Sequence, residues 1–247
     1  IEMADLAAEL NGMLDRLRED YRRLAEFSSD LAHELRTPIS NLLTQTQVAL
    51  SSKRDVPTYR NILASNAEEL ERMARMVADM LFLAKAERGM PLPNRERFSA
   101  AQEVQALLEF YDAVAEEKGI RLSVTGDGEI DGDRLMFRRA VSNLLSNAVR
   151  HGDPGSPVTV KIGTSDEGVS ISVCNTADDI DPALLPRLFD RFFRGDPSRA
   201  HPASEGAGLG LSITKAIVEA HGGDITAASG DRTVRVVMRF PPSAAVS

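Results

Sequence analysis

The stretch His33-Glu34-Leu35-Arg36-Thr37-Pro38 places an imidazole next to a carboxylate inside a helical sequence. Apolar residues recur around it at helical spacing, at positions 31, 35, 42 and 49. At about 100° per residue, His33 lies roughly 200° around the helix from Leu31 and faces away from that apolar stripe. We therefore expect the imidazole of His33 to be reachable from solvent.

This arrangement has the chemistry of a phospho-acceptor site. Glu34 can accept a hydrogen bond from the protonated ring nitrogen of His33, which leaves the lone pair of the other nitrogen free to attack phosphorus. Thr37 lies four residues after His33 on the same face, where its hydroxyl can hold a water molecule near a phosphoryl group. Pro38 cannot donate to the carbonyl of Glu34, so we expect the helix to bend or loosen there. The alternative is a solvated helical histidine with ordinary neighbours.

Composition narrows the class of protein. The 247 residues suffice for one large domain or two smaller ones, and two fit the pattern better. A formal net charge of −8 argues against direct nucleic-acid binding, which needs clustered Lys and Arg. Cys174 is the only cysteine, so an internal disulfide is impossible and a cytosolic compartment is predicted. No apolar run reaches the roughly 20 residues that cross a bilayer, and nothing resembles a signal peptide, so we expect the chain as given to be soluble.

The first third of the chain is predicted to be a helical hairpin. Strong helix formers fill residues 1 to about 52, turn residues follow at 51–57, and a second helix runs to about Arg88. The second helix carries apolar residues every seven positions, with a further set interleaved at the same period: Leu63, Leu70, Val77 and Ala84, with Asn66, Met73 and Met80. Such a seam predicts a symmetric dimer whose helices form a four-helix bundle.

Beyond residues 89–93 the pattern changes to alternating helices and strands, and we place a domain boundary there. Strands are predicted at 120–124, 158–162, 169–173 and 234–238, and helices at 99–118, 134–150 and 209–220. We expect one sheet with helices on one face.

The helix at 134–150 has a polar face as well as an apolar one. Val141, Leu144, Leu145 and Ala148 form the predicted buried face, whereas Asn143, Asn147 and Arg150 share another, next to His151. Asparagine is a poor residue for a helix interior, so two of them four residues apart indicate a function. An amide oxygen of Asn147 can coordinate Mg²⁺, and Arg150 can bind phosphate oxygens. The alternative is a solvated helix face.

A glycine-rich turn opens the last predicted helix. In Gly206-Ala207-Gly208-Leu209-Gly210-Leu211, glycines before a helix N-terminus allow phosphates to approach backbone N–H groups. Before it lie the aromatic run 188–194, which includes Phe189 and Arg194, and a polar stretch at 195–205 with the composition of a mobile lid. The alternative is a surface loop over a core filled by phenylalanines.

In this order, the segments around His33, along 138–151, at 188–194 and at 206–211 resemble the H-, N-, F- and G2-boxes of bacterial sensor histidine kinases. The N- and G2-boxes are similar to those of the wider GHKL ATPase superfamily. The resemblance implies an all-α helical hairpin, forming a dimeric four-helix bundle, followed by an α/β sandwich of the GHKL ATPase (Bergerat) type. It implies the end of a HAMP-like linker helix at 1–20, a dimerisation and histidine phosphotransfer domain at 21–90 and a catalytic ATP-binding domain at 91–247. For residues 1–20 an ordinary amphipathic helix is the alternative.

The resemblance also implies an activity. Such a chain would be the cytoplasmic portion of a bacterial inner-membrane sensor, would reach the membrane only through segments outside this sequence, and would act as a homodimer. It would phosphorylate His33 from Mg-ATP and pass the phosphoryl group to an aspartate of a response regulator. Thr37 would assist removal of phosphate from that regulator. The residues implied to bind nucleotide are Asn143, Asn147 (also the Mg²⁺ ligand), Arg150, His151, Asn175, Ile180, Phe189, Arg194, Gly206, Gly208, Leu209 and Gly210.

One segment departs from the family pattern. Where family members carry Asp-x-Gly-x-Gly, this chain has Asn175-Thr176-Ala177-Asp178-Asp179-Ile180. An amide oxygen can still accept from the adenine amino group, but without charge assistance. A similar Asn occurs in a subgroup that resembles heavy-metal-resistance sensors, together with the pattern at 186–192, which favours a working pocket.

Two other functions fit parts of the sequence. A GHKL-type ATPase, such as a chaperone or mismatch-repair protein, would share the pocket but lacks a histidine-bearing hairpin before it. A dimeric scaffold or regulator phosphatase that binds nucleotide poorly would fit the altered segment at 175–180.

Overall fold

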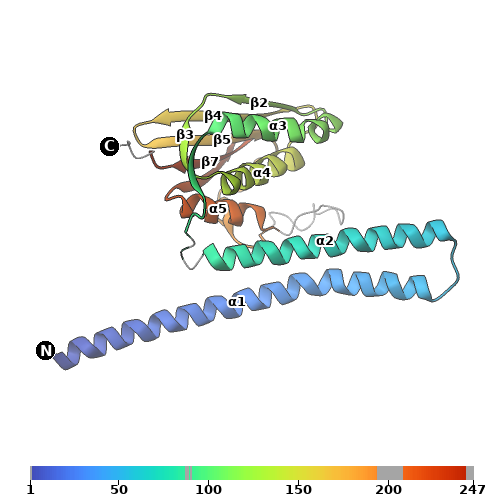
Figure 1. Cartoon of the computed structure of the whole chain (residues 1–247), viewed down its shortest axis with the longest axis horizontal. Coiled ribbons are helices and arrows are strands. Elements are labelled where there is room, and N and C mark those ends of the chain that lie inside the picture. Colours follow the sequence, from blue (N-terminus) through green and yellow to red (C-terminus); the bar gives the residue numbers. More distant parts are fainter. Residues whose placement is uncertain (1, 87–88, 90, 194–207, 243–247) are drawn as a thin grey trace. The chain divides into compact units, whose positions relative to one another are not determined.

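Two long helices, α1 (Glu2–Leu50) and α2 (Val56–Ala86), form the first part of the chain (Figure 1). The computed structural model describes residues 2–86, 89, 91–193 and 208–242, which divide into compact units at residues 1–78 and 79–247. The predicted break between the helices is confirmed, and Asp55 begins α2 by accepting the Thr58 N–H at 3.2 Å. These contacts with Thr58 lower the pKa of the Asp55 carboxyl.

The bend or loosening expected at Pro38 stays a prediction, and Pro38 does not end the helix. The helix α1 runs without a break through Pro38, which is buried. Helix formation is cooperative, so the long flanking segments keep the helical path although one backbone hydrogen bond is missing.

The apolar seam predicted in α2 separates into two sets. Asn66 and Met73 are half-buried, and Asn66 donates from Nδ2 to Oγ1 of Thr46 in α1 at 3.3 Å. Leu63 and Leu70, in contrast, are 66% and 56% exposed. One set therefore packs within the hairpin and the other leaves an apolar surface uncovered in the single chain.

The described residues of the second unit form two sheets, three complete α-helices, a short 3-10 helix and the last residues of α2. A small antiparallel sheet pairs β1 (Arg95–Ser99) with β3 (Glu129–Asp133). The larger sheet has the order β2-β4-β5-β7-β6, in which only the β2–β4 pair is parallel. Its strands are β2 (Arg121–Thr125), β4 (Pro157–Ser165), β5 (Gly168–Thr176), β6 (Asp224–Gly230) and β7 (Thr233–Phe240). The helices α3 (Ala100–Glu117), α4 (Arg134–His151) and α5 (Gly210–Ala220) lie on one face of it, and a short 3-10 helix, η1 (Pro186–Phe189), precedes α5 (Figure 1).

The predicted strands and helices are confirmed, but the single sheet was wrong. The strands β1, β3 and β6 were not predicted because they are short or built from small and charged residues, as in Glu129-Ile130-Asp131-Gly132-Asp133. They form because neighbouring strands pair with them. None of the described helices combines the length and the hydropathy that a membrane crossing needs.

The core lies between α4, α5 and the covered face of the large sheet. Cross-strand register places Val160, Val173 and Val236 side by side on this face. The predicted apolar face of α4 packs against it, with Val141, Leu144, Leu145 and Ala148 all buried. Burial of each such Val or Leu side chain contributes about 1.5–3 kcal/mol.

A buried histidine joins α5 to the small sheet. The Asp133 N–H donates to Nε2 of His221 at 3.0 Å, so the proton is on Nδ1, which donates to the Ile217 carbonyl at 2.7 Å. The ring is 7% exposed and packs edge-on against Phe240 at 5.5 Å. Burial lowers the pKa of His221, and the charge of Arg95 acts in the same direction, whereas the Ile217 carbonyl and the charge of Asp133 oppose the shift.

This geometry predicts a loss of stability in mild acid. The unfolded histidine takes up its proton near the ordinary pKa of 6.5, whereas the folded ring does so only at lower pH. The contribution of His221 is therefore complete above about pH 6.5 and falls as the pH decreases through the folded pKa. We expect the melting temperature of His221→Gln to fall less than that of the wild type between pH 7.5 and 5.5, measured by circular dichroism. Equal decreases in the two proteins would contradict this assignment.

Candidate functional site

The segment around His33 lies on α1, as predicted. The imidazole of His33 is exposed, whereas Leu31 and Leu35 are half-buried, which confirms that the ring is reachable from solvent. Glu34 is half-buried and Thr37 is exposed one turn after His33. The hydrogen bond predicted between Glu34 and the ring is not formed in this structure, so their relation here is one of proximity along the helix.

Asn143 ties α4 to α5. Its Nδ2 donates to the Gly210 carbonyl at 3.0 Å and to Oγ1 of Thr214 at 3.5 Å. The Thr214 hydroxyl itself donates to the same Gly210 carbonyl at 2.9 Å. The amide donor predicted to face nucleotide thus holds the first turn of α5 in place.

Asn147 and Arg150 are positioned differently. Both are half-buried on α4, and neither side chain forms a hydrogen bond or ion pair with any part of the chain that the structure describes. The last turn of α4 is fixed instead by Lys118, whose Nζ donates to the carbonyls of Val149 at 3.1 Å and Arg150 at 3.2 Å. The amide and the guanidinium therefore remain available to a ligand, and His151 is exposed beside them.

Asn175 is the residue before the last in β5 and lies on the face of the sheet that the helices cover. Its register partners are Val158 on β4 and Val234 on β7. The residue is 8% exposed, and its side-chain amide has no hydrogen-bond partner among the described residues. The amide of Asn175 is therefore available to a ligand with a complementary donor and acceptor.

The turn before α5 leaves a helix N-terminus open. Leu209 precedes the helix and is 2% exposed, and no side chain of the described residues caps the first turn. Gly208 has φ +69°, and a Cβ there would lie 2.8 Å from the Phe192 carbonyl carbon, so glycine is required. The Phe192 N–H donates to the Gly208 carbonyl at 3.1 Å. Uncapped N–H groups at a helix N-terminus suit an anion such as phosphate.

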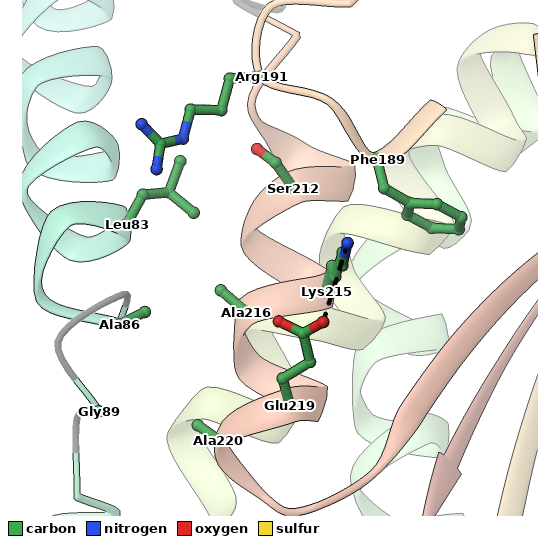
Figure 2. Close-up of a pocket in the computed structure, with 10 residues that line it drawn as sticks. All are labelled: Leu83, Ala86, Gly89, Phe189, Arg191, Ser212, Lys215, Ala216, Glu219 and Ala220. Atoms are coloured by element: carbon green, nitrogen blue, oxygen red, sulfur yellow. Dashed lines mark ion pairs between the residues drawn. The ribbon is translucent and has the colours of Figure 1, made fainter. Parts of the chain in front are cut away.

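The remaining predicted site residues lie elsewhere in the second unit or outside the described residues. The Ile180 N–H donates to Oγ of Ser229 at 2.9 Å, which anchors the segment after β5. Phe189 lines a separate hollow of about 490 Å³ with Ser212, Lys215 and Glu219 of α5 (Figure 2). Neither Asn143 nor Thr214 lines this hollow. Arg194 and Gly206 lie outside the described residues.

A nucleotide with its metal fits the residues present. The described parts of the chain hold no group of three or more His, Cys, Asp or Glu side chains arranged for a metal ion. Mg²⁺ does not need such a group, because it retains water and takes one or two protein oxygens together with phosphates. The unpaired amide of Asn147 can supply one such oxygen.

No motif drew attention to Arg232, which lies beside the segment that follows Asn175. Its guanidinium binds Asp153 and Asp178, and its backbone N–H binds Asp179. A polar residue in a hairpin loop is common, so the sequence carried no signal of these contacts.

Two family profiles match the chain. The family described as His Kinase A (phospho-acceptor) domain matches residues 23–89, which include His33. The family described as Histidine kinase-, DNA gyrase B-, and HSP90-like ATPase matches residues 132–244, which include the amides of α4 and Asn175.

Curated relatives match nearly all of this chain. Sensor histidine kinase CusS of Escherichia coli (strain K12) is 46% identical over 242 residues, covering 98% of this chain and 50% of CusS. Sensor protein CzcS of Cupriavidus metallidurans is 40% identical over 241 residues, covering 97% of this chain and 50% of CzcS. The chain therefore spans about half the length of the curated relatives it matches.

Solved structures share the fold. Histidine kinase ThkA, in a crystal structure with response regulator protein TrrA, superposes with a TM-score of 0.73 at 20% identity, covering 92% of this chain and 64% of that chain. The predicted fold class, a helical hairpin followed by a GHKL-type α/β domain, is thereby confirmed.

The hydrogen bonds from Asn143 to α5 lead to a prediction about stability. Asn143→Ala removes the donor to the Gly210 carbonyl, and we expect a loss of about 1 kcal/mol in the free energy of unfolding, since a typical intramolecular hydrogen bond contributes that much. Amide exchange in the first turn of α5, followed by mass spectrometry, is expected to accelerate. Ser146→Ala, on the same helix, is the matched control. Equal exchange in the two variants would contradict the assignment.

Proposed function

Because the chain belongs to the sensor histidine kinases, with a phospho-acceptor domain followed by a histidine kinase-type ATPase domain, we propose that it transfers the γ-phosphoryl group of ATP to His33. The phosphoryl group then passes to an aspartate of a response regulator. The observation that carries this proposal is the exposed imidazole of His33 within the segment that matches the phospho-acceptor family.

The chemistry at His33 follows from its neighbours. One ring nitrogen attacks the γ-phosphorus with its lone pair, and the bond from that phosphorus to the bridging oxygen of ADP breaks. The other ring nitrogen carries a proton, which Glu34 is positioned along the helix to accept once the ring becomes positively charged. The product is a phosphohistidine, whose phosphorus–nitrogen bond is acid-labile.

The second unit supplies the nucleotide site in this proposal. The unpaired amide of Asn175 accepts a hydrogen bond from the adenine amino group, in place of the aspartate usual in the family. Arg150 and the open N-terminus of α5 bind phosphate oxygens. Mg²⁺, held with the amide oxygen of Asn147, neutralises charge on the phosphates when bound.

The proposed partners are inferred from the exposed apolar residues of α2 and from a similar solved structure. The exposed apolar residues Leu63 and Leu70 of α2 fit a second copy of the chain, so we propose a homodimer built as a four-helix bundle. The structure of ThkA was solved with a response regulator, and we propose a regulator of that class as the phosphoryl acceptor here. Thr37, exposed beside His33, is proposed to assist removal of phosphate from that regulator.

The names and lengths of the relatives indicate where the chain acts in the cell. The relatives are named as sensors and are about twice as long as this chain, so we propose that the chain is the cytoplasmic portion of a membrane sensor.

A GHKL-type ATPase without phosphotransfer is disfavoured by the phospho-acceptor segment. A scaffold that binds nucleotide poorly is disfavoured by the unpaired amide of Asn175, which keeps an acceptor available for adenine.

Labelling tests the phosphotransfer step. We expect the purified chain to retain label from γ-labelled ATP with Mg²⁺, and the label to be lost in acid. His33→Gln is expected to lose the label entirely while binding ATP with unchanged affinity, because the residues proposed to bind nucleotide belong to the second unit. Label retained by His33→Gln would refute the assignment, and abundant free phosphate without labelled protein would indicate an ATPase.

Base recognition gives a second test. Asn175→Leu removes the acceptor for the adenine amino group, and we expect ATP affinity to fall about tenfold, equivalent to one lost hydrogen bond of about 1.4 kcal/mol. Asn175→Asp restores a charge-assisted acceptor and is expected to bind ATP at least as tightly as the wild type. Competition between ATP and GTP for a fluorescent nucleotide measures both. Unchanged affinity in Asn175→Leu would place adenine elsewhere.

A further inference from the structure

The hairpin that joins β6 to β7 has an unusual loop. Its two residues, Asp231 and Arg232, have φ +52° and +55°, as a two-residue hairpin loop requires. Glycine and asparagine adopt this conformation readily, whereas arginine in the left-handed region costs about 1–2 kcal/mol. The turn itself therefore gives no reason for an arginine at this position.

The contacts of Arg232 give that reason. Its Nη2 lies 2.7 Å from Oδ2 of Asp153, and its Nη1 lies 3.3 Å from Oδ1 of Asp178. The backbone takes part as well, since the Arg232 N–H donates to Oδ1 of Asp179 at 2.9 Å and the Ala177 N–H donates to the Arg232 carbonyl at 3.1 Å. The hydrogen bond with Asp153, followed by the charges of Asp153 and Asp178, raises the pKa of the guanidinium.

These contacts join the two elements that carry the proposed nucleotide ligands. Asp153 follows the end of α4, three residues after Arg150, and its N–H donates to the Thr176 carbonyl at 2.8 Å. Asp178 and Asp179 follow Asn175 on the segment after β5. A single side chain thus spans from the end of the α4 helix to the segment that begins with the adenine-facing amide.

The exposure of the contacts indicates what they do. The side chains of Arg232, Asp153 and Asp178 are 62%, 38% and 59% exposed. Ion pairs this exposed contribute little to global stability. They can still restrict one short segment, because the guanidinium and the backbone of Arg232 hold it at Ala177, Asp178 and Asp179.

We propose that Arg232 is a positioning residue that clamps the segment 175–179 against the end of α4 and so sets the base preference of the nucleotide site. The inference rests on the proposed function, because it assigns the place of Asn175 in adenine recognition. The family pattern has glycine at the positions of Ala177 and Asp179. In this chain both residues contact the backbone of Arg232, and these contacts set the conformation of the segment.

Three variants separate the clamp from the turn. Arg232→Gly removes the guanidinium and gives the loop an Asp-Gly pair, which suits the hairpin better than the wild type does. Arg232→Lys keeps a positive charge but not the two-pronged contact. Asp231→Gly relaxes the neighbouring loop position and leaves the guanidinium in place, so it is the matched control.

Two measurements on the full chain test the proposal. Amide exchange of residues 176–180 without nucleotide reports the clamp directly, and competition of ATP and GTP for a fluorescent nucleotide reports base preference. For Arg232→Gly we expect faster exchange of this segment, ATP affinity reduced about threefold to tenfold and a smaller ATP-over-GTP ratio, with a melting temperature equal to or above that of the wild type. Arg232→Lys is expected to lie between, and Asp231→Gly to match the wild type.

Each contrary result has a distinct meaning. Unchanged exchange in Arg232→Gly would overturn the clamp, whether or not nucleotide binds. Faster exchange with an unchanged ATP-over-GTP ratio would overturn the role in base preference. A lower melting temperature with equal losses of ATP and GTP affinity would make Arg232 merely structural. If the wild type binds neither nucleotide, the proposed function fails and, with it, the role in base preference, while the exchange result still decides the clamp.

Discussion

The packing of one face of α4 against the large sheet is the constraint on which the candidate site depends. Val141, Leu144 and Leu145 are at most 2% exposed, and burial of each contributes about 1.5–3 kcal/mol. Because these three residues must stay inside, the helix cannot rotate about its axis. The same polar residues therefore always remain outside. The positions of Asn143, Asn147 and Arg150 are therefore consequences of core packing, that is, of the hydrophobic effect.

The polar groups around this helix divide into those that are paired and those that are not. Asn143 is committed to the first turn of α5, and His221 is committed to the backbone at Asp133 and Ile217. The amides of Asn147 and Asn175 have no partner within the described chain. Both amides are therefore available to a ligand, whereas that of Asn143 is not. This contrast separates an asparagine that holds the fold together from two that remain available to a ligand.

The helical hairpin obeys the same physics with a different result. Half of its apolar seam packs inside the hairpin, while Leu63 and Leu70 remain exposed. Two antiparallel helices cannot bury a stripe that encircles more than one face of each, so a partner helix pair is the natural cover. The imidazole of His33 faces outward because Leu31 and Leu35 of the same helix face inward.

Much of this was determined by the sequence alone, because helical and strand periodicity are local properties of the chain. The spacing of apolar residues predicted the helices α1 to α5 and the strands β2, β4, β5 and β7, as well as the exposure of His33. Tertiary structure decided the rest. The strands β1, β3 and β6 have weak patterns of their own and exist because a neighbour pairs with them, and the helix continues through Pro38 because its flanking turns hold it. The contacts of His221 and Arg232 join residues 88 and 79 positions apart, and no local pattern can specify which distant backbone group a side chain will meet.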